Sequence, residues 1–141
     1  MNLLVNLDVD DLDQAVQFYS QAFGLATGRR FGTAGVEMLG GSAPIYLLLK
    51  APGSLASEAS AERRIYERHW KPVHLDFVVE DIDAAVSRAL AAGAQLEKPA
   101  ATQKWGKLAL MADPFGHGFC FVQFLGRGYD EIAEVCQCGN T

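Results

Sequence analysis

The chain has 141 residues, of which 50% are hydrophobic and 21% are charged, a composition typical of one globular domain with a sizeable core. Its net charge of −5, without a cluster of lysine and arginine, argues against nucleic acid as a partner. No apolar run is long enough to cross a membrane, and no signal peptide precedes the first strand, so we expect no membrane partner. The three cysteines are an odd number, which argues against a disulfide framework. We therefore expect a cytoplasmic location.

The chain contains an internal repeat. Residues 7–16 match residues 77–86, and in both places the alternation of a strand gives way to helical spacing. Each copy is too small to bury a core alone, so the repeat predicts one domain built from two units.

The first unit is predicted over residues 1–51. A strand over residues 3–9 leads to Asp11, which is suited to cap a helix that runs to about Phe23 and ends at Gly24. Three further predicted strands complete the unit, at residues 26–33, 36–39 and 45–49.

Residues 52–72 form the predicted linker, where the composition shifts to serine, alanine, glutamate and arginine. The segment 56–66 could form a polar helix, although its apolar face is poor. We expect a surface connection or a helix that faces a partner. His69 and Trp70, just before the second unit, are expected at an interface.

The second unit is predicted over residues 73–125. Its first strand begins at His74, and Asp81 is suited to cap the helix that follows. Three further predicted strands complete this unit, at residues 95–98, 108–112 and 119–124. Residues 113–116, Asp-Pro-Phe-Gly, have the preferences of a type I turn, and residues 126–141 form a C-terminal tail.

Two units with a Val-x-Asp-Leu/Ile-Asp helix start resemble the vicinal oxygen chelate superfamily of glyoxalase I, extradiol dioxygenases and bleomycin-resistance proteins. Phe18-Tyr19 before Phe23-Gly24-Leu25 is similar to its first-helix signature, and Asp113-Pro114-x-Gly116 is similar to its second. The resemblance spans residues 3–125. It implies an α+β fold in which two βαβββ units form a cup-shaped mixed sheet with the helices outside.

In the metal-using members of the superfamily, four ligands come from the first and last strands of each unit. By this resemblance, the four ligand positions correspond in this chain to Leu4, Tyr46, His74 and Cys120. Leucine cannot bind a metal, neutral tyrosine is a poor ligand, and one histidine with one thiol falls short of the usual zinc or iron sets. We therefore expect no metal and no cofactor.

The candidate site residues each have a structural alternative. His74 either contacts a ligand or is satisfied by Asp76, which lies on the same face of the strand. Cys120 either faces the ligand or packs inertly in its apolar strand. Tyr46 could offer its hydroxyl to a ligand or be a core aromatic, and Trp105 could wall the pocket or pack at an edge.

The remaining candidates are polar groups at strand ends, in a turn and in the tail. Asn6 and Asp8 reach the pocket or lie in solvent at its mouth. His117 is either a solvated or a functional turn histidine. Cys136 and Cys138 could bind a metal or oxidise, or belong to an end without function.

Two functions remain open. The first is a metal-free protein that binds a small organic molecule, aromatic or cationic, in the cup, as drug-sequestering members of the superfamily do. The second is a lyase or isomerase in which His74, with Asp76 or Tyr46, acts as general base. The resemblance and the exposed linker also imply a homodimer, whose cups form within one chain or by exchange of units between two chains.

Overall fold

A computed structural model describes residues 1–134, and in it each half of the chain runs strand, helix, strand, strand, strand. The elements are β1 (Val5–Val9), α1 (Leu12–Phe23), β2 (Ala26–Phe31), β3 (Gly35–Leu39), β4 (Ile45–Leu49), β5 (Leu55–Ser57), β6 (Ser60–Arg63), β7 (Leu75–Val78), α2 (Ile82–Ala92), β8 (Gln95–Gln103), β9 (Gly106–Ala112), β10 (Gly118–Phe124) and the 3-10 helix η1 (Gly128–Glu131).

The strands of the two units form two four-stranded sheets with the same topology. The first sheet has the order β1-β4-β3-β2 and the second has the order β7-β10-β9-β8. In each sheet the first strand pairs with the last strand of its unit in parallel, and the other pairs are antiparallel. The predicted α+β fold with two βαβββ units is therefore confirmed. Within residues 1–134, no strand pair joins the two sheets, so β1 and β7 are both edge strands.

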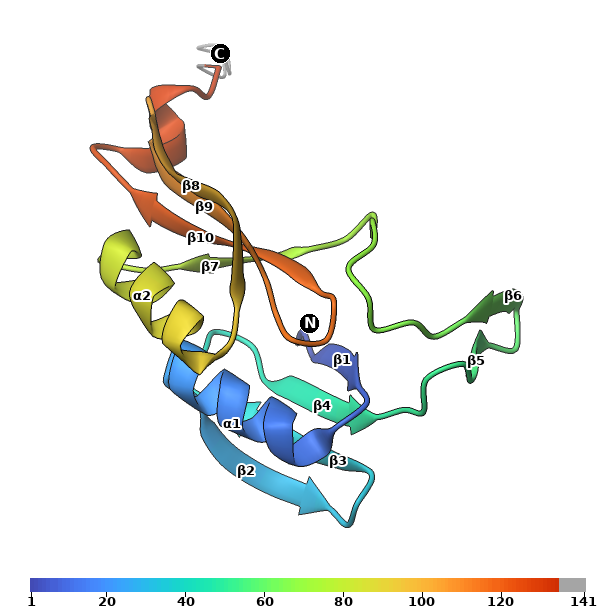
Figure 1. The fold of residues 1–141 in the computed structure, drawn as a ribbon. Coiled ribbons are helices and arrows are strands. Elements are labelled where there is room, and N and C mark those ends of the chain that lie inside the picture. Colours follow the sequence, from blue (N-terminus) through green and yellow to red (C-terminus); the bar gives the residue numbers. More distant parts are fainter. Residues whose placement is uncertain (135–141) are drawn as a thin grey trace.

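Both helices begin and end where the sequence predicts. The side chain of Asp11 accepts a hydrogen bond from the Gln14 amide at 3.0 Å, and that of Asp81 accepts one from the Ala84 amide at 3.1 Å. A glycine with positive φ, Gly24, ends α1, because only glycine adopts this conformation at little cost. Figure 1 shows α1 and α2 lying side by side against the two sheets.

Aromatic side chains join the two units in the core. The ring of Phe23, at the end of α1, lies 4.1 Å from that of Phe77 and 5.6 Å from that of Phe121. The hydroxyl of Tyr19 donates a hydrogen bond of 2.6 Å to the buried carboxylate of Asp113 in the second unit. The units are thus held together by side chains, since their sheets share no backbone hydrogen bonds in the described part of the chain.

The linker contains a hairpin of β5 and β6, so the helix considered for residues 56–66 is wrong. Arg64 explains the hairpin, because its guanidinium donates to the carbonyl oxygens of Leu55 and Ala56 at 2.6 and 3.2 Å. The same side chain forms an ion pair of 2.8 Å with Asp8 of β1, which fixes the base of the hairpin to the first sheet. Figure 1 shows the hairpin projecting away from both sheets.

The C-terminal part of the chain follows β10 through η1. Among residues 1–134, no helix combines the length and the apolar character that a membrane span requires. Cys136 and Cys138 lie outside the described residues.

Candidate functional site

Three of the predicted site residues meet on the second sheet, on the face opposite the helices, which we call its cup face. Cys120 of β10 pairs with Asp76 of β7, and His74 precedes β7. His74 Nε2 lies 3.3 Å from Asp76 Oδ1, and one donor atom from each of the three residues lies within 4.8 Å of the others. The strand alternation that places Phe77 of β7 and Phe119 and Phe121 of β10 toward the core places these three side chains together on the opposite face.

The members of this His74–Asp76–Cys120 cluster differ in their access to solvent. The side chain of His74 is 58% exposed, whereas Cys120 is buried. Burial raises the pKa of the Cys120 thiol to about 11, and the carboxylates of Asp76 and Glu97 act in the same direction. Near neutral pH the thiol of Cys120 therefore keeps its proton, and it lies beside the exposed ring of His74.

The linker forms one wall of a pocket over this cluster. The guanidinium of Arg68 lies against Gly118, at a point where a side chain on residue 118 would collide with it. Arg68 is held there by an ion pair of 2.7 Å with Glu97 of β8. Together with Trp70, it borders a cavity of about 160 Å³ that His74 and Cys120 also line, which we call the second-sheet pocket.

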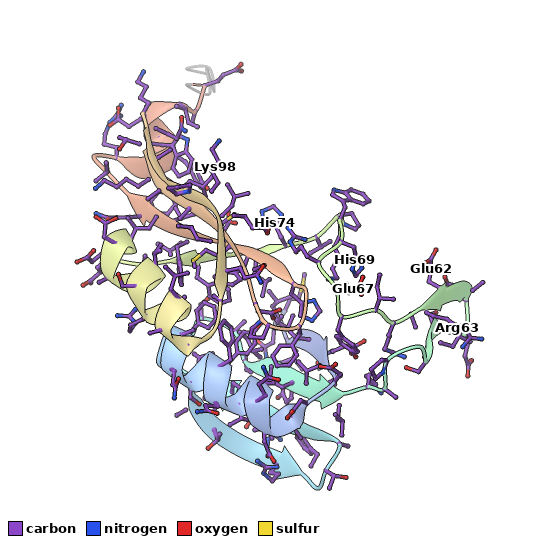
Figure 2. The ribbon with its side chains drawn as sticks, viewed as in Figure 1. Glu62, Arg63, Glu67, His69, His74 and Lys98 are labelled. Carbon is purple, nitrogen blue, oxygen red and sulfur yellow. The ribbon has the colours of Figure 1, made fainter. Side chains whose placement is uncertain are left out.

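Figure 2 shows His74 beside the strands of the second sheet, whereas Glu62 and Arg63 lie out on the hairpin of the linker. The tip of the hairpin is therefore separate from the His74–Asp76–Cys120 cluster.

Tyr46 belongs to a different cluster, on the cup face of the first sheet. Its hydroxyl donates to the carboxylate of Glu37 at 2.8 Å, and Arg29 binds the same carboxylate at 2.7 Å. Glu37 is only 6% exposed. Its pKa is lowered to about 2, mainly by the hydrogen bonds that the Arg29 side chain donates to its carboxylate. Sequence reasoning missed Glu37 and Arg29, although a glutamate between Val36 and Met38 of an apolar strand was an available signal.

The other predicted residues lie apart from the His74–Asp76–Cys120 cluster or at its border. Leu4 precedes β1 and is exposed. Trp105 packs against Phe124 and Tyr129, with ring centroids at 6.2 and 5.1 Å, in an aromatic group beside η1. Within one chain the structure thus places Tyr46 on one sheet and the histidine, aspartate and cysteine on the other. Whether all of them contact one ligand stays a prediction.

A second cavity lies between the edge strands β1 and β7, and we call it the inter-unit crevice. Its volume is about 340 Å³, within the range of small-molecule sites. Its polar lining comes from five side chains besides Tyr19: Asn6, Asp8, Lys71, His74 and His117. His117 is fixed by contact of its Nε2 with the carbonyl oxygen of Asp8 at 2.7 Å. Lys71 was missed because a lysine between Trp70 and Pro72 belongs to no periodic pattern.

The donor set can be tested against the metal that the superfamily resemblance implies. On the first sheet, Leu4 has no donor atom and the hydroxyl of Tyr46 is already bound to Glu37 and Arg29. On the second sheet, His74, Asp76 and Cys120 offer three donor atoms, one more than the sequence reasoning counted. A thiol must lose its proton to bind a metal, and burial favours the protonated form of Cys120. The residues therefore do not fit a site that draws ligands from both units.

Two βαβββ units with packed helices and polar clusters on their cup faces define a protein of the glyoxalase/bleomycin resistance/dioxygenase fold. A family model described as "Glyoxalase-like domain" matches residues 4–122, so the chain belongs to this family and to the vicinal oxygen chelate superfamily.

Two curated relatives are named as anthracycline biosynthesis proteins. The chain is 30% identical over 129 residues to the anthracycline biosynthesis protein DnrV of Streptomyces peucetius, a match that covers 92% of this chain and 43% of the relative. The corresponding figures for DauV of Streptomyces sp. (strain C5) are 30% over 133 residues, 92% and 43%. The chain therefore spans less than half the length of these relatives.

Solved structures of low sequence identity share the fold. TioX from Micromonospora sp. ML1 aligns with a TM-score of 0.69 and 22% identity, covering 89% of this chain and 99% of that one. The fosfomycin resistance protein FosX from Listeria monocytogenes aligns with a TM-score of 0.65 and 19% identity, covering 89% and 93%. At such low sequence identities these similarities show a shared fold and do not show a shared function.

Proposed function

We propose that the chain binds a small, partly aromatic organic molecule without a metal ion, and that the ligand contacts the cup face of the second sheet. The observation that carries the proposal is the second-sheet pocket, which His74 and Cys120 line together with Trp70 and Arg68 of the linker, while Asp76 lies 3.3 Å from His74. An aromatic wall with a few fixed polar groups is the usual construction of a small-molecule site.

The relatives support an aromatic ligand. Both curated relatives are named for anthracycline biosynthesis, and anthracyclines have a planar aromatic body. This chemistry agrees with the expectation of an aromatic molecule. The open imidazole of His74 and the carboxylate of Asp76 are the polar groups that would orient such a ligand.

A thermal shift experiment tests the proposal. A small aromatic cation such as benzyltrimethylammonium should raise the melting temperature of the purified chain, whereas divalent metals should not, because a ligand that binds the native state stabilises it. His74→Ala should reduce the shift, and Lys104→Ala, in the exposed turn before Trp105, should leave it unchanged. Stoichiometric bound metal by elemental analysis, lost in His74→Ala, would contradict a metal-free site.

A catalytic role is the second candidate, and the contact between His74 and Asp76 favours it. If His74 Nε2 donates to Asp76 across 3.3 Å, the other ring nitrogen, Nδ1, keeps its lone pair and can accept a proton from carbon beside a carbonyl. This reading predicts exchange of such protons of hydroxyacetone into deuterated buffer, observed by NMR. No exchange above that of the His74→Ala variant would count against it.

We also propose that the chain is a homodimer. The linker exposes large apolar side chains, of which Trp70 is the most prominent at 82% exposure. Leu55 and Ile65 of the same segment are also exposed, and several exposed apolar side chains on one segment support a surface that a second copy covers.

A further inference from the structure

The inter-unit crevice contains a lysine that the proposed function does not use. Lys71 Nζ donates a hydrogen bond of 3.0 Å to the carbonyl oxygen of Gly116, which holds the ammonium near the start of β10. The side chain borders the inter-unit crevice, the second-sheet pocket and a third cavity along the linker. Its position is therefore fixed at a junction of cavities.

The charge of Lys71 has no carboxylate partner among residues 1–134, where no ion pair includes it. Two carboxylates are in the neighbourhood, and both are bound to other groups. Asp8 forms its ion pair with Arg64 at 2.8 Å. Asp113 is only 4% exposed and accepts the hydroxyl of Tyr19 at 2.6 Å as well as two backbone amides of its own turn.

Partial burial makes the ammonium of Lys71 responsive to an anion. Burial lowers the pKa of Lys71, because the ammonium loses part of its hydration and the protein supplies too few polar contacts to compensate. The Arg68 guanidinium acts in the same direction, and Asp113 opposes it. An anionic group beside such an ammonium gains a charge-assisted hydrogen bond in a medium that screens charge less than water does.

The rest of the crevice suits an apolar body. Its walls come from β1, from the segment before β7, from β7 itself and from β10: Val5, Leu7, Val73, Leu75, Phe77 and Phe119. The strands β1 and β7 that border the crevice can be followed in Figure 1. Two phenylalanine rings offer stacking surfaces for an aromatic group.

We propose that Lys71 makes the inter-unit crevice a binding site for small aromatic carboxylates, with the carboxylate on the ammonium and the ring against the apolar walls. This site shares Lys71 and His74 with the second-sheet pocket, but its preference for a carboxylate comes from Lys71 and does not follow from the function proposed above. A ligand of about ten ring carbons matches the volume of the crevice, since cavities of this size hold small organic molecules.

The direct test compares an acid with its neutral amide on the unaltered chain. Calorimetric titration with 2-naphthoate and with 2-naphthamide should show about tenfold weaker binding of the amide, the loss expected for one charge-assisted hydrogen bond. Equal affinities would overturn the proposal. So would an absence of 2-naphthoate binding at millimolar concentration.

Variants assign the effect to Lys71. Lys71→Met should weaken 2-naphthoate by about tenfold and leave 2-naphthamide unchanged, whereas Lys71→Arg should keep most of the preference for the acid. Lys104→Met makes the same change of net charge in the exposed turn before Trp105 and should alter neither affinity. An equal loss of acid binding in Lys71→Met and Lys104→Met would overturn the assignment. If Lys71→Met does not fold, the comparison of acid and amide on the unaltered chain decides.

Discussion

At the scale of single residues, the hydrogen bond from Tyr19 to Asp113 is the most constrained polar contact between the units. Asp113 Oδ1 accepts from the amides of Phe115 and His117, so this aspartate organises the turn, and Oδ2 accepts from Tyr19 at 2.6 Å. Burial raises the pKa of Tyr19 well above its ordinary value, and the Asp113 carboxylate acts in the same direction. The phenol thus stays a donor across the physiological range of pH.

Removing the hydroxyl of Tyr19 should destabilise the fold. In Tyr19→Phe one oxygen of the buried carboxylate of Asp113 loses its partner, and a lost hydrogen bond to a charged group costs about 1.5–3 kcal/mol. Urea denaturation measures the change. Tyr129→Phe is the matched control, because Tyr129 is half-exposed and should change the free energy of unfolding by less than about 0.5 kcal/mol. Equal effects of the two variants would mean that the contact contributes nothing.

Glu37 should make the stability of the chain depend on acid pH. Its folded-state pKa of about 2 lies below the ordinary value of 4.5, so the unfolded chain binds the proton first. The contribution of Glu37 is complete above pH 4.5 and is lost as the pH falls toward 2. Glu37→Gln should therefore lose less stability over this interval than the unaltered chain, as thermal melts at pH 7, 4 and 2.5 would show. Identical pH profiles would contradict the prediction.

At the scale of elements, the linker shows what periodicity can and cannot predict. The strands and helices of both units are predicted from alternation and from capping aspartates, and the structure contains each of them, although β8 extends to Gln103, beyond the predicted end at residue 98. The hairpin of β5 and β6 is not predicted, because it depends on side-chain bonds from Arg64 to the carbonyl oxygens of Leu55 and Ala56 and on an ion pair with Asp8, which is distant in sequence. The partner of Tyr46 was missed for a similar reason. Only the register of β3 against β4 places Glu37 opposite Tyr46, and a single strand contains no information on register.

The anchoring of the hairpin by Arg64 can be tested by hydrogen exchange. The amide of Gly53 donates to the carbonyl of Arg64 at 2.8 Å, and the amide of Arg64 donates to that of Ser54 at 2.9 Å. In Arg64→Met these amides should exchange at least about tenfold faster, while global unfolding changes little, because the hairpin opens as a local unit. Arg30→Met, on the exposed β2, should leave both amides protected. Protection unchanged in Arg64→Met would show that the backbone alone holds the hairpin.

At the scale of the whole molecule, the proposed homodimer should depend on the linker. Light scattering at micromolar concentration should give twice the mass of one 15.3 kDa chain. Trp70→Ser should shift the equilibrium toward monomer, because it removes a large apolar side chain from the expected interface. Leu90→Ser, which changes an exposed apolar residue of α2, is the control and should leave the mass unchanged. A monomeric mass for the unaltered chain would rule out the dimer under these conditions.

The absence of hydrogen bonds between the two sheets in the described part of the chain has a mechanical consequence. Hydrogen-bonded strands keep a fixed separation, whereas the separation of β1 and β7 is set by the packing of side chains such as Phe23, Phe77 and Phe121. A change in that packing would alter the gap between the two edge strands while both ladders stay intact. We expect the gap between β1 and β7 to widen or narrow to the thickness of whatever enters it.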